Sequence, residues 1–228
     1  MHGNRIRRWF AGSSGIALVF SLCANAAAPV TYRKTLPPVL KEIETKYAAA
    51  GSIEAHFEQV TESVHLKQKK RSSGTITIKV PDKIRWETTQ PDKNLLVSDG
   101  KRFWFYTPPF DADEPGQVIE RKGGDVRSQL ARALMTGSFS AAQQKNGMKI
   151  IRLSPSEYTL LPKKGSAGSV KQAAIEVDLQ EKLIRKVTLL HSDGNTAEIS
   201  LSRIQLGKPV SDESFVFSPP PNTDVVKE

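Results

Sequence analysis

The fold is most strongly constrained by residues 74–110, which read GTITIKVPDKIRWETTQPDKNLLVSDGKRFWFYTPPF. Apolar and polar residues alternate here with a period of two, which is typical of strands buried on one face. Pro81, the turn residues 91–94 and Asp99-Gly100 interrupt the alternation. Proline cannot donate to a strand ladder, and an Asp-Gly pair favours a tight hairpin turn. The stretch therefore predicts four strands in an antiparallel meander.

Strand-like alternation continues on both sides of this meander. A long strand is predicted at 52–63, followed by a basic hairpin connection at 65–71. After the meander, strand-like segments occur at 117–121, 149–153, 158–162, 170–179, 183–191, 196–206 and 215–217. Ten or eleven strands at such spacing predict an antiparallel sheet that curls into a barrel or part of one.

The segment before the first long strand has helical spacing. Thr35 is a candidate N-cap and Gly51 a candidate end. Its apolar positions are Leu36, Leu40, Ile43 and Tyr47. Such a stripe has to pack on another element, and the neighbouring sheet is the candidate.

A second helix is predicted after the meander. Asp125 is its expected cap, and it runs to about Thr136 before Gly137. Leu130 and Leu134 belong to its narrow apolar stripe. The fold class is therefore mainly β with helices.

The first 26 residues have the organisation of a cleavable secretory signal peptide. Arginines precede an apolar run at 15–22, and Ala24-Asn25-Ala26 supplies the small residues that signal peptidase requires. We expect residues 1–26 to be removed and residues 27–228 to form a single domain in the periplasm. The formal net charge of +9 favours anionic partners such as membrane surfaces and acidic protein patches, and nucleic acid is not expected.

No constellation of residues predicts a catalytic or metal site. The histidines His2, His56, His65 and His191 are isolated, and none has ligand spacing beside a carboxylate. The single cysteine, Cys23, lies in the expected signal peptide, and no serine occupies a strand-to-helix elbow. We therefore expect no enzyme, metal or cofactor, because the distinctive residues are apolar and aromatic.

Several motifs, taken in order along the chain, resemble the periplasmic outer-membrane lipoprotein carrier family, LolA. They are Phe57-x-Gln59, Pro81 with Trp86, Gln90-Pro91-Asp92, Leu96 to Gly100 followed by Phe103 to Tyr106, and Phe215-x-Phe217-x-Pro219-Pro220. The resemblance covers most of the chain after the signal peptide. It implies an incomplete antiparallel β-barrel, with a helical lid over an apolar cavity that takes up acyl chains.

The resemblance also implies partners. Acylated lipoproteins would be the cargo, an inner-membrane lipoprotein-releasing ABC transporter the donor, and an outer-membrane lipoprotein receptor the acceptor. The carrier is expected to be a monomer with no nucleic-acid partner. Two alternatives stay open: an envelope sensor or adaptor on the same fold, and a binding protein for another apolar ligand such as a glycolipid.

The predicted cavity residues follow from the alternation of the meander and from the two helical stripes. On the concave face of the sheet we expect Ile76, Ile78, Val80, Ile84 and Trp86, and from the helices above it we expect Leu40, Ile43, Leu130 and Leu134. The alternative is that these residues fill a core and leave no open pocket.

One departure from the family concerns the lid. An arginine usually precedes the proline that is Pro81 here, and it holds the lid closed through polar contacts. This chain has Val80 at that position, with Lys79 before it and Arg85 after it. In an alternating strand Lys79 points to the opposite face, so the latch is expected to be absent, replaced from elsewhere, or unnecessary.

Overall fold

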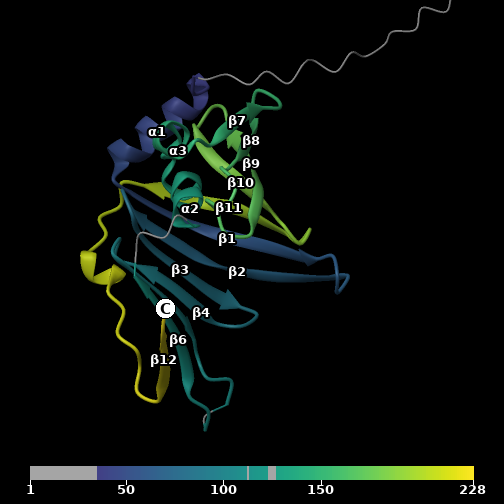
Figure 1. Ribbon diagram of the computed structural model, residues 1–228. Coiled ribbons are helices and arrows are strands. Elements are labelled where there is room, and N and C mark those ends of the chain that lie inside the picture. Colours follow the sequence, from purple (N-terminus) through teal and green to yellow (C-terminus); the bar gives the residue numbers. More distant parts are fainter. Residues whose placement is uncertain (1–34, 112, 123–126) are drawn as a thin grey trace, which may run out of the picture.

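The structure is a computed structural model that describes residues 35–111, 113–122 and 127–228 (Figure 1). The predicted signal peptide and the predicted cap Asp125 lie outside the described residues. Within the described part of the chain, no helix is both long enough and apolar enough to cross a membrane.

The described strands form one sheet that does not close on itself. Their order is β12-β6-β5-β4-β3-β2-β1-β11-β10-β9-β8-β7. The bounds are β1 Ser52–Ser63, β2 Gln68–Lys79, β3 Lys83–Gln90, β4 Asn94–Ser98, β5 Arg102–Thr107, β6 Gly116–Lys122, β7 Lys149–Arg152, β8 Glu157–Leu161, β9 Val170–Asp178, β10 Leu183–His191, β11 Thr196–Leu206 and β12 Thr223–Lys227. The predicted four-strand meander and the incomplete antiparallel barrel are confirmed.

In the described part of the chain, three α-helices cover one face of the sheet (Figure 1). They are α1 Pro38–Ala50, α2 Arg127–Thr136 and α3 Phe139–Asn146. The prediction of Thr35 as the N-cap of α1 is wrong, because Pro37 holds that position with an extended backbone. A residue that precedes a proline disfavours the helical region, so the run Leu36-Pro37-Pro38 delays the helix. The predicted end is confirmed, since Gly51 adopts a left-handed conformation and its N–H donates to the Tyr47 carbonyl.

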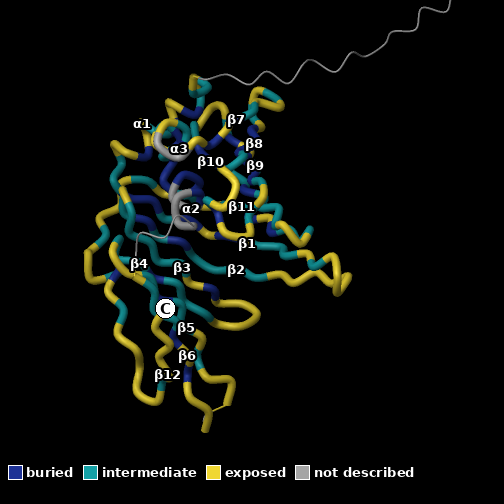
Figure 2. Tube along the Cα trace, viewed as in Figure 1, coloured by how far each residue is buried: buried dark blue, intermediate teal, exposed yellow. Residues whose placement is uncertain are grey.

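Most buried side chains lie between the helices and the sheet, whereas the strands at the β12 end of the sheet, β12, β6, β5 and β4, are less buried (Figure 2). A second, small cluster groups Val97, Trp104 and Val118 with Phe217 from the C-terminal segment. The rings of Trp104 and Phe217 lie 6.3 Å apart. The C-terminal segment is therefore attached to β5 by aromatic contacts, within a cluster that also contains Val97 of β4 and Val118 of β6.

Two features of the C-terminal segment differ from the sequence prediction. The predicted strand at 215–217 is wrong, because Asp212–Phe215 form a 3-10 helix, η1, in which the Ser211 hydroxyl accepts from the Glu213 N–H. Phe215 is fully buried, but the segment around it is not a strand. Strand β12, which was not predicted from the sequence, then pairs in parallel with β6 and forms the edge of the sheet.

The connection between β1 and β2 is shorter than predicted. The turn comprises residues 64–67, and the basic residues Lys69, Lys70 and Arg71 belong to β2. The two strands pair in continuous register from Ser52↔Lys79 to Ser63↔Gln68. This hairpin is the longest in the described part of the chain, and it extends beyond the region that the helices cover (Figure 1).

Candidate functional site

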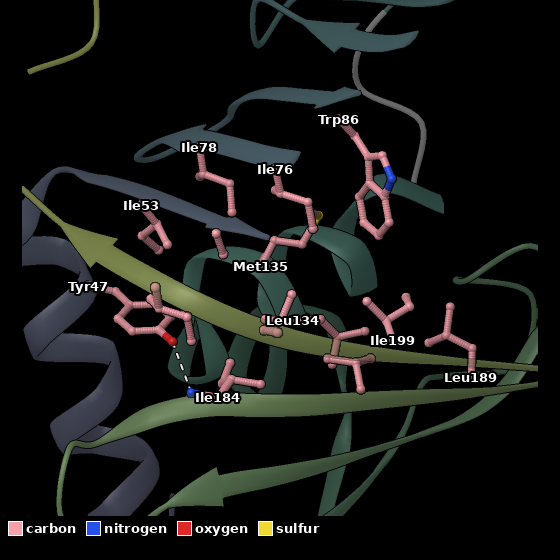
Figure 3. Close-up of a pocket in the computed structure, with 14 residues that line it drawn as sticks. Tyr47, Ile53, Ile76, Ile78, Trp86, Leu134, Met135, Ile184, Leu189 and Ile199 are labelled. Carbon is pink, nitrogen blue, oxygen red and sulfur yellow. Dashed lines mark hydrogen bonds between the residues drawn. The ribbon is translucent and has the colours of Figure 1, made fainter. Parts of the chain in front are cut away.

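An apolar cavity of about 110 Å³ lies between the helices and the concave face of the sheet (Figure 3). Its walls come from two helices and from strands on both sides of β1. The lining residues are Tyr47 from α1; Leu134 and Met135 from α2; Ile53 and Ala55 from β1; Ile76 and Ile78 from β2; Trp86 from β3; Ile184, Val187 and Leu189 from β10; and Ile199, Leu201 and Ile204 from β11. All are apolar apart from the Tyr47 hydroxyl and the Trp86 indole N–H, so the cavity offers little for a polar ligand.

The structure brings part of the predicted set into this lining. Ile76 and Ile78 are neighbours on β2, Trp86 is the residue of β3 paired with Ile76, and Leu134 approaches from α2. The Trp86 ring also packs on Phe57, with ring centroids 4.6 Å apart. The alternation in residues 74–88 thus identifies one wall of the cavity.

The other predicted residues lie elsewhere. Leu40, Ile43 and Leu130 are buried in the core around the cavity and do not line it. Ile84 is half-buried against the same core. Val80 follows the last residue of β2, and its N–H donates to the Gly51 carbonyl at 2.9 Å. Leu40, Ile43, Leu130 and Ile84 therefore support the walls of the cavity, and neither they nor Val80 form its surface.

The part of the wall that comes from β10 was missed for an identifiable reason. Strand pairing between β9 and β10 is irregular between Ile184 and Lys186. A period of two counted from Ile184 does not reach Val187 and Leu189, yet all three side chains line the cavity. An irregularity of this kind resets which side chains face inward, and sequence alternation alone does not reveal it.

Tyr47 connects the lid helix α1 to β10. Its hydroxyl accepts a hydrogen bond from the Ile184 N–H at 3.0 Å, drawn as a dashed line in Figure 3. Pairing between β10 and β11 begins at Lys186↔Ser200, so Ile184 lies beyond the end of that ladder. Burial raises the pKa of Tyr47 to about 12, although the Ile184 N–H and the charge of Arg185 oppose the shift. The hydroxyl therefore stays protonated under all ordinary conditions.

A second polar contact joins α1 to α3. The Glu44 carboxylate accepts from the Ser140 N–H at 3.0 Å and from the Lys41 ammonium at 2.9 Å. Burial acts to raise the pKa of Glu44, but its hydrogen bonds with Ser140 and Lys41 outweigh burial and lower it. The carboxylate is therefore ionised at neutral pH and keeps the two helices together.

The end of α1 is also attached to the β9–β10 turn. Lys46 donates to the Glu181 carbonyl at 2.5 Å, and Lys182 pairs with Glu42 at 3.0 Å. Because these contacts come from α1, they hold the helix across the end of the cavity without an arginine before Pro81.

The cations near Pro81 make contacts that do not involve the helices. Lys79 donates to Asp212 at 2.6 Å and to the Val210 carbonyl at 3.1 Å. Arg85 pairs with Glu87 of the same strand at 3.3 Å. Lys79 therefore attaches the C-terminal segment to the sheet, on the face opposite to that of Ile78, as the alternation predicts.

The sequence was also compared with known proteins. The family described as "Outer membrane lipoprotein carrier protein LolA" matches residues 48–218. The chain belongs to the LolA family. An outer-membrane lipoprotein carrier protein of Dechloromonas aromatica is 30% identical over 185 residues, covering 78% of this chain and 82% of the relative. One from Vibrio parahaemolyticus is 28% identical over 211 residues, covering 92% of this chain and 91% of the relative.

Solved structures also resemble the chain. The crystal structure of a LolA superfamily protein from Nitrosomonas europaea superposes with a TM-score of 0.46 at 11% sequence identity. The superposition covers 78% of this chain and 96% of that one.

Among the described residues, no group of three or more histidine, cysteine, aspartate or glutamate side chains is arranged to hold a metal ion.

Proposed function

We propose that the protein is a non-enzymatic carrier that binds the acyl chains of lipoproteins in the apolar cavity and moves them through the periplasm. The observation that carries this proposal is the almost wholly apolar lining of the cavity. Membership of a lipoprotein carrier family, and two relatives named as lipoprotein carrier proteins, support the choice of ligand.

The energetics explain why such cargo needs a carrier. A triacylated lipoprotein anchor has about 45 methylenes, and each contributes about 0.8 kcal/mol when it leaves water. Without a carrier, the anchor cannot cross an aqueous compartment at a useful rate. The cavity lining supplies the apolar surface that replaces the bilayer during transfer.

The cavity in this structure is too small for that cargo, so loading requires the lid to move. An apolar cavity of about 150 Å³ is enough for one benzene molecule, and the cavity here has about 110 Å³. Leu134 and Met135 of α2 and Tyr47 of α1 fill the space opposite the sheet. We therefore assign this structure to a closed arrangement, from which the helices separate as acyl chains enter.

The finer steps of the pathway are part of the proposal. An inner-membrane ABC transporter would deliver the lipoprotein, and an outer-membrane lipoprotein receptor would accept it. The N-terminal signal peptide expected from the sequence directs the chain to the periplasm, where both partners are accessible.

A release assay tests this function. Inner-membrane vesicles with the transporter and a labelled triacylated lipoprotein are incubated with the purified protein, and the soluble fraction is analysed. We expect a one-to-one soluble complex that Trp86→Glu and Leu134→Glu each reduce at least tenfold, because a charge in the apolar lining opposes acyl chains. The exposed apolar residue Leu153 provides a control, and Leu153→Glu should release lipoprotein normally.

Two outcomes would contradict the carrier function. One is the absence of lipoprotein from the soluble fraction although the transporter is competent. The other is a native mass spectrum in which the bound molecule is an apolar ligand without an acylated cysteine.

A further inference from the structure

The tip of the β1–β2 hairpin, residues 63–71, combines exposed apolar side chains with a dense group of cations. Val64 is 54% exposed and Leu66 69% exposed, although both are branched aliphatic residues. Lys67, Lys69, Lys70 and Arg71 follow within five positions, and all are exposed. We propose that this hairpin tip binds reversibly to the surface of an anionic phospholipid bilayer.

The backbone of the hairpin tip is held in place. The Val64 N–H donates to the Asn195 side chain at 2.9 Å, which joins the tip to the β10–β11 turn. The Leu66 N–H donates to the Ser63 hydroxyl at 3.4 Å. Lys67 takes a left-handed backbone conformation with φ of 50°, which completes the turn. The two apolar side chains are therefore presented outward on an ordered turn, which lowers the entropic cost of binding.

The strand pairing leaves the basic part of the tip open on one side. Pairing of β2 with β3 begins only at Ser73↔Gln90, so residues 68–72 extend past β3. The hairpin accordingly projects to the right of the sheet (Figure 1), and its end is exposed (Figure 2). A flat surface that approaches this end meets the hairpin tip and the β10–β11 turn bonded to it.

Acidic neighbours neutralise only part of this charge. Lys69 pairs with Glu62 at 3.0 Å, and Lys70 pairs with Asp92 at 2.7 Å. Among the described residues, Lys67 and Arg71 have no ion-pair partner. A net positive charge therefore remains beside the two apolar side chains, and it complements the negative surface potential of anionic lipids.

A lipid surface fits this tip better than a protein partner does. A stable protein interface takes about 20 to 30 residues from each side, whereas the tip has nine residues on a narrow hairpin. Insertion of one or two apolar side chains together with a basic cluster is enough for weak, reversible membrane contact. Reversible contact is what a protein that leaves the membrane with its cargo requires.

Phe110 is the most exposed of the large apolar residues, at 92%, but it lacks the basic surroundings of the hairpin tip. It lies beside Asp111, Asp113 and Glu114. Carboxylates at that loop are repelled by an anionic surface. Phe110 therefore provides a matched control that separates specific insertion of the tip from general stickiness.

Vesicle sedimentation with the protein lacking residues 1–26 tests the proposal. At low ionic strength we expect binding to vesicles that contain phosphatidylglycerol and little binding to neutral phosphatidylcholine vesicles. The double substitution Val64→Ser/Leu66→Ser should weaken binding about tenfold or more, whereas Phe110→Ser should not change it. Lys67→Gln/Arg71→Gln should weaken binding similarly and reduce its dependence on salt, whereas Lys163→Gln/Lys164→Gln should have little effect.

A site-specific probe gives a second, independent measurement. Cys23 is the only cysteine and lies in the removed segment, so Leu66→Cys creates a single labelling site. An environment-sensitive dye on that thiol should shift to the blue with phosphatidylglycerol vesicles, and the same dye on Leu153→Cys should not. Because the positions are exposed, circular dichroism should show that all variants keep the fold of the unsubstituted protein.

The proposal is overturned if the unsubstituted protein fails to bind anionic vesicles, or if the tip variants bind as it does. It is also overturned if Phe110→Ser loses as much binding as Val64→Ser/Leu66→Ser. The cavity variant Leu134→Glu separates this result from the carrier function, because it should lose lipoprotein release and keep vesicle binding.

Discussion

The hydrogen bond from the Ile184 N–H to the Tyr47 hydroxyl makes a sharp prediction about stability. Tyr47→Phe removes the acceptor and leaves almost all of the side chain in place. Both residues are buried, with 2% of Tyr47 and 1% of Ile184 exposed. The phenylalanine ring fills the same space, so the substitution tests the hydrogen bond and not the packing.

The magnitude follows from the N–H that loses its partner. A buried donor without an acceptor costs about 1–3 kcal/mol, and no pairing of β10 with β11 reaches Ile184 to replace the bond. The free energy of unfolding of Tyr47→Phe should therefore fall by about 1–3 kcal/mol. For a domain of this size, each kcal/mol lowers the melting temperature by about 2–4 °C.

Urea unfolding followed by tryptophan fluorescence measures this change, with Tyr158→Phe as the matched control. The Tyr158 ring is buried like that of Tyr47, but its hydroxyl donates at 3.0 Å to the carbonyl of Pro155, an exposed residue. Water can replace that donor, so Tyr158→Phe should cost less than Tyr47→Phe. The reasoning would be refuted if both variants lost the same free energy of unfolding, or if Tyr47→Phe lost less than about 0.5 kcal/mol. Either result would mean that the hydrogen bond does not stabilise the packing of α1 on β10.

Three further predictions concern alkaline pH, acidic pH and close packing. The pKa of Tyr47 in the folded protein is about 12, above its ordinary value of 10.0. As pH rises from 10 to 12, the free energy of unfolding should therefore fall by about 2–3 kcal/mol more in the unsubstituted protein than in Tyr47→Phe. If the urea midpoints of the two proteins instead change in parallel with pH, the prediction is wrong. Because the pKa of Glu44 is lowered, the amide protection factors in α3, corrected for the intrinsic exchange rate, should fall below pH 4.5, and Glu44→Gln should show no such step. Gly74→Ala places a Cβ 1.9 Å from the Glu87 carbonyl oxygen. The free energy of unfolding, measured from the urea midpoint, should therefore fall by about 3 kcal/mol or more. A decrease no larger than that of the neighbouring substitution Ser73→Ala would refute the clash.

The sequence predicts the sheet well where one face alone is buried. In residues 74–107 the period of two, the Asp99-Gly100 turn and Pro81 all favour the same strands. The structure has β3, β4 and β5 at nearly the predicted bounds, whereas β2 begins earlier than predicted, at Gln68. The alternation also identifies Ile76, Ile78 and Trp86 as neighbours on the concave face. Local propensity and burial agree there, so a local pattern is sufficient.

The prediction fails where a contact distant in the sequence decides the structure. Phe215 and Phe217 alternate like strand residues, but their positions come from packing on the sheet and from the 3-10 turn that Ser211 caps. Strand β12 depends on pairing with β6, a hundred residues earlier in the chain. The bond between Tyr47 and Ile184 likewise needs the irregular end of β10, which no local pattern marks.

The length of the β1–β2 hairpin connects the cavity to the proposed membrane contact. The apolar alternation of β1 ends at Phe57, and Gln59 and Thr61 continue the same face with polar side chains that bond to each other at 3.0 Å. The strand nevertheless runs six residues beyond Phe57 to Ser63, about 20 Å at the usual rise per residue. This outer half buries little apolar surface and contributes little to the core, so stability alone does not account for it. The inner half of this hairpin forms part of the cavity wall, and its outer half carries Leu66 at the tip. A rigid hairpin of this kind would hold the cavity at a set distance from a bilayer.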